Sequence, residues 1–118
     1  MKRLLLASIL LTLALEALAQ GPPALEEALS LKEEGRCTEA IRLLESMPPD
    51  PETLFALGEC LEETDRQRAI EVWQDFLSRY PQDPEASPLL LRIGRLYREA
   101  GNLQAALQAY LHYARTGG

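Results

Sequence analysis

Regular breaks divide residues 23–115 into six segments whose apolar residues recur at spacings of three and four. This is the period of an α-helix, and no run alternates long enough to make a strand. Because the breaks are short, each helix should run antiparallel to the next. The pattern therefore predicts an all-α chain, with helices over 23–34, 38–46, 51–63, 66–79, 84–100 and 103–115. The fifth could start at Asp83-Pro84 or at Ser87-Pro88.

The six helices form three similar pairs. The third pair carries Leu90, Ile93, Gly94 and Tyr97, then Ala106 and Tyr110; the second carries Leu54, Leu57, Gly58 and Leu61, then Ala69 and Trp73. This pattern resembles the tetratricopeptide repeat family, and the first pair is a weaker copy aligned on Ala28. The resemblance implies units over about 23–50, 51–83 and 84–118, stacked as a short right-handed solenoid that serves as a protein–protein interaction scaffold.

Two glycines stand in the middle of predicted helices, where glycine costs about 1 kcal/mol relative to alanine. We expect them to let the two helices of a pair cross closely, so that small residues meet. Gly58 would then face Ala69, and Gly94 would face Ala106. The alternative is that these glycines are neutral.

Residues 1–19 have the composition of a secretory signal peptide. A basic "MKR" precedes about twelve mostly apolar residues and the small-large-small "ALA" at 17–19, which predicts cleavage before Gln20. A membrane anchor is the competing interpretation, but the apolar run ends at Glu16, short of the roughly 20 residues that a span needs. The mature chain, 20–118, has no segment that predicts a membrane span, and we expect it in the periplasm or secreted.

Composition gives little support to catalysis or nucleic-acid binding. The formal net charge is −6, and an acidic chain is repelled by phosphate backbones. The single histidine, His112, has no nucleophile or carboxylate partner at helical spacing, and a metal site needs more ligands than the sequence clusters. We therefore expect no enzyme activity, no cofactor and no metal; a small enzyme on a helical scaffold is the disfavoured alternative.

The two cysteines fall on neighbouring predicted helices. Cys37 lies at the start of one helix and Cys60 near the end of the next, so antiparallel packing would place them together. Export permits oxidation, and a Cys37–Cys60 disulfide would strengthen the weak first unit. The alternative is two separate buried thiols.

The first helix of each pair should line the concave face of the stack. One stripe of these helices is left over from packing between helices, with the same offsets in each unit, and it predicts a row of apolar residues beside charges. It suits a peptide or protein partner. The candidate partner-binding residues are Leu25, Leu29, Phe55, Glu59, Leu91, Arg95 and Arg98, with Lys32 and Glu62 in the same stripe.

The last predicted helix, 103–115, is apolar almost all round, whereas a final helix of a stack should be polar outside. We expect it to dock on a second copy or another protein, unless its alanines make the surface tolerable. The preferred function is an exported scaffold of the bacterial envelope that binds a protein partner. The alternative is a structural protein that assembles with itself through this helix.

Overall fold

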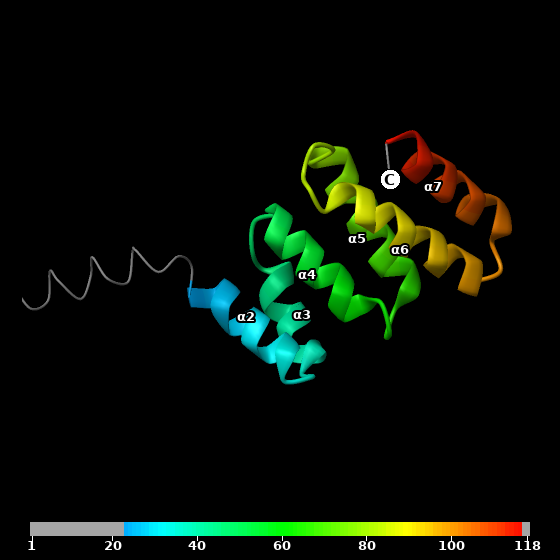
Figure 1. Ribbon diagram of the computed structural model, residues 1–118. Helices are drawn as coiled ribbons and strands as arrows, with labels where there is room; N and C mark the ends of the chain where they lie inside the picture. The colour runs from blue at the N-terminus through cyan, green and yellow to red at the C-terminus, as the bar shows by residue number, and fades with distance from the viewer. Residues whose placement is uncertain (1–22, 117–118) are drawn as a thin grey trace, which may run out of the picture.

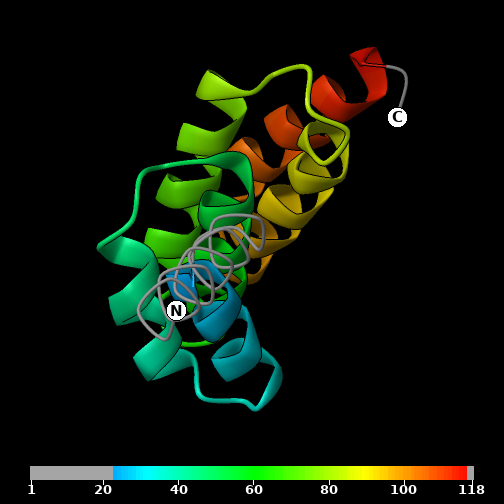
Figure 2. The same cartoon turned by 90° about the vertical axis from the view of Figure 1, so that its left-hand side faces the viewer.

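The computed structural model describes residues 23–116, which form six helices and no strand within that range. The helices are α2 (Pro23–Glu33), α3 (Cys37–Glu45), α4 (Pro51–Leu61), α5 (Arg66–Arg79), α6 (Ala86–Glu99) and α7 (Leu103–Arg115). They form three antiparallel pairs stacked in chain order, with α2–α3 at one end and α6–α7 at the other (Figures 1 and 2). The predicted all-α repeat fold is confirmed. The predicted signal peptide lies outside the described residues.

Glycines follow the ends of two of the helices. Gly35 and Gly101 have φ of 78° and 83°, the left-handed region that glycine enters without steric cost. Each is followed by a residue whose N–H reaches back to the helix: Arg36 to the Leu31 carbonyl at 2.8 Å and Asn102 to the Tyr97 carbonyl at 2.9 Å. These bonds form the Schellman motif, which satisfies carbonyls at a helix end.

The start of α6 lies between the two positions that the sequence leaves open. Asp83 accepts a hydrogen bond from the Glu85 N–H at 2.9 Å, and its carbonyl accepts one from the Ala86 N–H at the same distance. This turn occupies the residues before the helix, so α6 begins at Ala86. The longer helix predicted from 84 is shortened by two residues.

The mid-helix glycines make room for aromatic rings, a neighbour that the expected contact between small residues did not include. A Cβ built on Gly58 would lie 2.0–2.5 Å from indole atoms of Trp73, and one on Gly94 would lie 2.5 Å from the nearest ring carbon of Tyr110. Trp73 is fully buried, and its Nε1–H donates to the Phe55 carbonyl at 3.3 Å. At each glycine, an aromatic ring from the partner helix therefore fills the space that a side chain would otherwise occupy.

The first pair solves the same packing problem with smaller residues. At the corresponding positions it has Ala28 in place of glycine and Leu44 in place of the aromatic residue, and both are buried. A methyl group on one helix is thus accompanied by a smaller side chain on the other.

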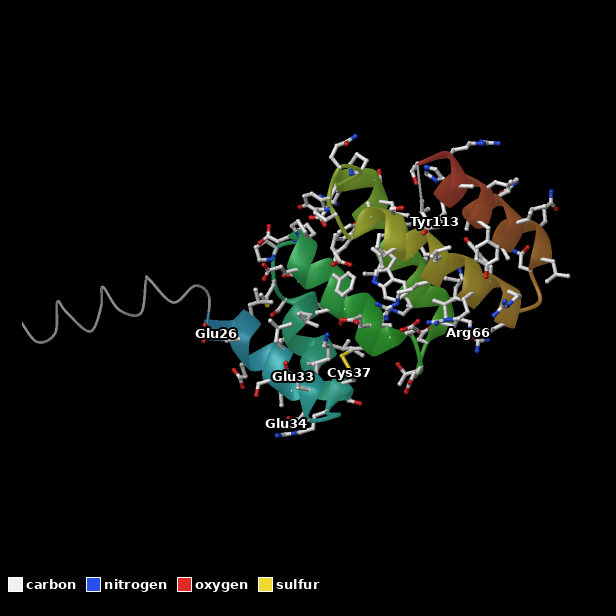
Figure 3. All side chains as sticks on the ribbon, viewed as in Figure 1. Glu26, Glu33, Glu34, Cys37, Arg66 and Tyr113 are labelled. Atoms are coloured by element: carbon white, nitrogen blue, oxygen red, sulfur yellow. A yellow bond between two sulfur atoms is a disulfide. The ribbon has the colours of Figure 1, made fainter. Side chains whose placement is uncertain are left out.

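A disulfide joins the first unit to the second. Cys37 begins α3 and Cys60 lies near the end of α4, with Cα atoms 5.2 Å apart (Figure 3). The predicted bond is present, and the alternative of two free thiols is not. No helix within residues 23–116 is long and apolar enough to cross a membrane.

Candidate partner-binding face

Helices α2, α4 and α6 are linked by ion pairs along one face of the stack, which we call the inner face. Lys32 of α2 pairs with Glu59 of α4. Arg92 of α6 reaches back to Glu59 at 3.2 Å and to Glu62 at 2.6 Å. Arg95, one turn further along α6, also contacts Glu62 at 2.6 Å. The first helices of all three units therefore share this face, as expected from the repeat.

Two of these ion pairs occupy the same place in successive units. Lys32 lies four residues after Ala28, and Glu59 lies one residue after Gly58. Glu62 and Arg95 stand at these two positions in the next pair of units, with the signs reversed. The Glu62 side chain is only 14 % exposed. These charges link neighbouring units, and their predicted contact with a partner stays a prediction.

Arg92 is the residue at the centre of this network. Its guanidinium lies 4.5 Å from the centre of the Trp73 ring and 5.6 Å from that of Phe55, within the range of cation–π attraction. Burial lowers the pKa of Arg92, but hydrogen bonds and charge attraction from Glu62 and Glu59 outweigh it and raise the pKa above its ordinary value. Arg92 therefore remains charged while it joins α4, α5 and α6.

Sequence reasoning missed Arg92 because it lies outside the stripe chosen for the partner. The available signal was the pair Glu59 and Glu62, which lie one turn apart on α4 and can flank one cation. Finding that cation required the register between α4 and α6, since Arg92 is 33 residues from Glu59.

A hollow of about 330 Å³ opens on the inner face between α2, α4 and the turn that precedes α6. We call it the inner groove. Its apolar lining includes the half-buried ring of Phe55, above the buried Ala56 and Phe76. The lining residues are Leu29, Lys32, Pro51, Glu52, Phe55, Ala56, Glu59, Phe76, Asp83 and Glu85.

The structure brings only part of the predicted stripe into this groove. Leu29, Phe55 and Glu59 line it. Leu25 is half-buried against the core instead. Leu91 is 39 % exposed on α6 and lies outside the groove lining.

The two arginines of the stripe are also outside the lining. Arg95 is held by Glu62, and Arg98 is exposed near the end of α6. The groove is therefore centred on α2 and α4, and binding by the stripe residues outside its lining stays a prediction.

The two ends of the inner groove differ in charge. Lys32 and Glu59 neutralise each other at one end. Glu52, Asp83 and Glu85 lie in the remaining lining, and no lysine or arginine among residues 23–116 forms an ion pair with them. The groove thus combines an aromatic floor with an acidic rim.

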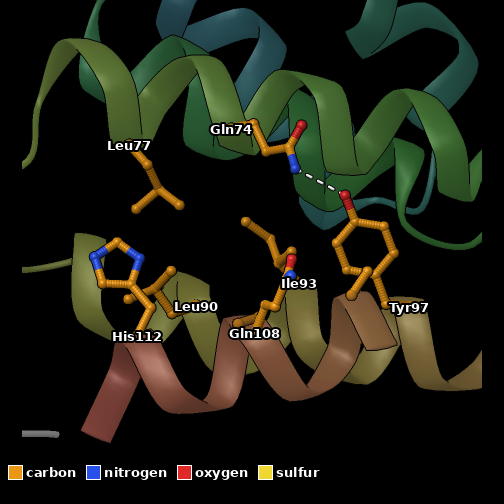
Figure 4. Close-up of a pocket in the computed structure, with 9 residues that line it drawn as sticks. Gln74, Leu77, Leu90, Ile93, Tyr97, Gln108 and His112 are labelled. Carbon is orange, nitrogen blue, oxygen red and sulfur yellow. Dashed lines mark hydrogen bonds between the residues drawn. The ribbon is translucent and has the colours of Figure 1, made fainter. Parts of the chain in front are cut away.

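A second hollow, of about 290 Å³, lies between α5, α6 and α7 (Figure 4). His112 and Leu77 approach it from opposite helices, and the Gln74 amide donates to the Tyr97 hydroxyl at 2.8 Å beside it. Its lining contains no carboxylate, cysteine or serine, and its titratable side chains are Tyr97 and His112. His112 also lines a further hollow that contains Asp83 and Ser87. No group of three or more potential metal ligands occurs among the described residues.

Comparison with known proteins agrees with this architecture. The family model described as tetratricopeptide repeat matches residues 52–83 and 89–115, and these two stretches together span half of the chain. The matches coincide with the second and third helix pairs, in which a glycine is covered by an aromatic ring. No curated protein matches the chain. On the family match and the six-helix fold, the chain belongs to the tetratricopeptide repeat family.

Proposed function

We propose that the protein is a scaffold that binds a segment of another protein in the inner groove. Proteins built from these repeats generally mediate protein–protein interaction, and they are typically scaffolds rather than enzymes. The observation that supports this site is the half-buried Phe55 ring on the floor of an open hollow. A partly exposed aromatic ring in a concave site is a characteristic anchor point for a partner's apolar side chain.

The lining of the groove also suggests the chemistry of that segment. A large apolar side chain would cover Phe55 and Leu29. A lysine or arginine within about one helical turn would face the unpaired carboxylates of Glu52, Asp83 and Glu85. The net charge of −6 adds a long-range attraction for a basic segment.

The cellular setting is part of the same proposal. The N-terminal sequence predicts export with cleavage before Gln20, and the Cys37–Cys60 disulfide is the kind of bond that persists in an oxidising compartment. We place the scaffold in the bacterial envelope, in the periplasm or secreted, without an enzymatic activity of its own.

Selection from a displayed library of random twelve-residue peptides tests the groove directly. We expect peptides with a large apolar residue to be enriched on the wild-type protein and lost on Phe55→Ala. The matched control is Leu91→Ala, which shortens an exposed side chain outside the groove lining. An equal loss on both variants, or peptides that ignore Phe55, would contradict binding in this groove.

The charge preference is tested on the same peptides. Replacing Glu52 and Glu85 by glutamine should weaken basic peptides about threefold to tenfold, since exposed ion pairs contribute about 0.2–1 kcal/mol each. Replacing Glu63 and Glu71, which are exposed and outside the inner groove, removes the same charge and should have little effect. Peptides whose binding depends on Phe55 but which contain no excess of lysine or arginine would refute the charge preference. They would still support binding in the inner groove.

A further inference from the structure

The exposed face of α7 corresponds to positions that are occupied in the earlier units. Ala40, Ala69 and Ala106 are equivalent in the three second helices. The positions three residues before, one after and five after this alanine are Cys37, Ile41 and Glu45 in α3; Arg66, Ile70 and Gln74 in α5; and Leu103, Leu107 and Leu111 in α7.

In the first two units these positions contact the unit that follows. Cys37 is bonded to Cys60 of α4, and Glu45 pairs with Arg68 of α5. In the second unit Arg66 pairs with Glu99 of α6 at 3.7 Å.

The remaining positions either contact the next unit or lie against the core. Gln74 donates to Tyr97 of α6 at 2.8 Å. Ile70, between Arg66 and Gln74 on α5, is 2 % exposed, and Ile41 of α3 packs against the core. This face of each second helix is therefore the stacking face of the repeat.

In the third unit the stacking face is apolar and open within the described residues. Leu103, Leu107 and Leu111 are 67 %, 58 % and 45 % exposed. Three leucines in a row at a spacing of four form one continuous stripe, and the helix that carries them has no acidic residue. Exposed apolar patches of this kind mark interaction surfaces.

From this continuity with the stacking face we propose that α7 binds α7 of a second copy, which gives a two-fold symmetric dimer. Leu103 and Leu111 lie four residues before and after Leu107, so the order of leucines along the stripe is unchanged when the helix direction is reversed. In an antiparallel pair Leu107 would therefore lie opposite its own copy, and Leu103 opposite Leu111. The absence of carboxylates on α7 removes like-charge repulsion between two copies of an acidic chain.

The exposed face of α2, at the other end of the stack, is a less suitable surface to cover the leucines of α7 than the α7 helix of a second copy. Helix α2 exposes Glu26, Glu27, Ser30 and Glu33, and Figure 3 shows Glu26 and Glu33 projecting from that end. Covering leucines with these side chains would desolvate carboxylates without pairing them. A head-to-tail chain of copies is therefore disfavoured.

The expected dimer is weak. Helix α7 has 13 residues and a length of about 20 Å, so one helix face covers less than the roughly 800 Å² per partner of a standard interface. We expect dissociation constants in the micromolar range and a dimer fraction that rises with concentration.

Sedimentation velocity across a concentration series tests the dimer on the protein purified after export. Leu107→Glu should weaken dimerisation at least tenfold, whereas Leu91→Glu, an exposed leucine of α6, should not. Circular dichroism checks that each variant remains helical. Should Leu107→Glu unfold, Leu103→Gln with Leu111→Gln supplies the same test at the two flanking exposed leucines.

Cysteine crosslinking distinguishes the possible arrangements. Leu107→Cys should give a disulfide-linked dimer under mild oxidation, because the two-fold axis brings this position against itself. A wild-type protein that stays monomeric at high concentration overturns the proposal and favours another protein as the occupant. Oligomers larger than a dimer, with no crosslink formed by the Leu107→Cys variant, would indicate head-to-tail stacking and also overturn it.

Discussion

Between α4 and α5, the Trp73 ring packs directly against Gly58, which has no side chain. The indole occupies the space that a Cβ at residue 58 would need, at 2.0–2.5 Å. The sequence predicted a close approach at this glycine but did not identify Trp73 as the nearest neighbour, because residue spacing does not show how far a long side chain reaches. The Tyr110 ring fills the corresponding space beside Gly94.

Gly58→Ala should lower the free energy of unfolding despite the better helix propensity of alanine. Overpacking costs about 1–3 kcal/mol, against a gain of about 1 kcal/mol from propensity. Trp73 is fully buried and cannot move aside cheaply, whereas Tyr110 is half-buried, so Gly94→Ala should cost less. Urea unfolding measures both variants, and equal or increased stability for Gly58→Ala would refute the explanation by overpacking.

A double-mutant cycle separates the clash from other effects. The first unit already combines alanine at residue 28 with leucine at residue 44. Gly58→Ala should therefore be less harmful in a Trp73→Leu background than in the wild type. Strictly additive losses would show that the ring and the glycine do not interact.

Arg92 and Arg95 contact the same carboxylate but should contribute unequally to stability. Arg92→Ala removes one of the two cations paired with Glu59 and one of the two paired with Glu62, which is 14 % exposed, and it also removes the contact with Trp73. We expect a loss of about 1–3 kcal/mol. Arg95 is 47 % exposed, so Arg95→Ala should cost less than about 1 kcal/mol. Comparable losses in urea unfolding would contradict the central role of Arg92.

At the scale of helices, local chemistry made the fold predictable. Glycine and asparagine at the ends of α6 and α7 act within a few residues, so their roles could be read directly from the sequence. The start of α6 could not, because the sequence offers caps at both Asp83 and Ser87, and the structure begins the helix between them, at Ala86. The bond between Cys37 and Cys60 was predictable from the order of the helices.

The disulfide should stabilise chiefly the first unit. It closes a loop with a sequence separation of 23, which in the chain-entropy model is worth about 3 kcal/mol. Cys37→Ala with Cys60→Ala should lower the free energy of unfolding by about that amount. Amide hydrogen exchange should show the loss of protection concentrated in α2 and α3. A uniform loss across all helices, or none, would argue against a local role.

For the whole molecule, the repeat predicted which helices share a face but not which side chains remain free on it. The ion pairs of the inner face join residues 27 to 33 positions apart, and they depend on how the units stack. The sequence therefore did not show that Glu59 and Arg95 also pair with neighbouring units. Phe55 and Leu29 were placed correctly on the inner face, and their role in binding stays a prediction.

Site-specific photocrosslinking in cells that produce the protein tests binding at the inner groove most directly. A photoreactive residue at Glu52, on the groove rim, should crosslink a distinct protein, and Phe55→Ala should remove that product. The same residue at Glu71, exposed on α5, should not form it. Identical products from both positions, or a Glu52 product that persists in Phe55→Ala, would contradict the proposed function.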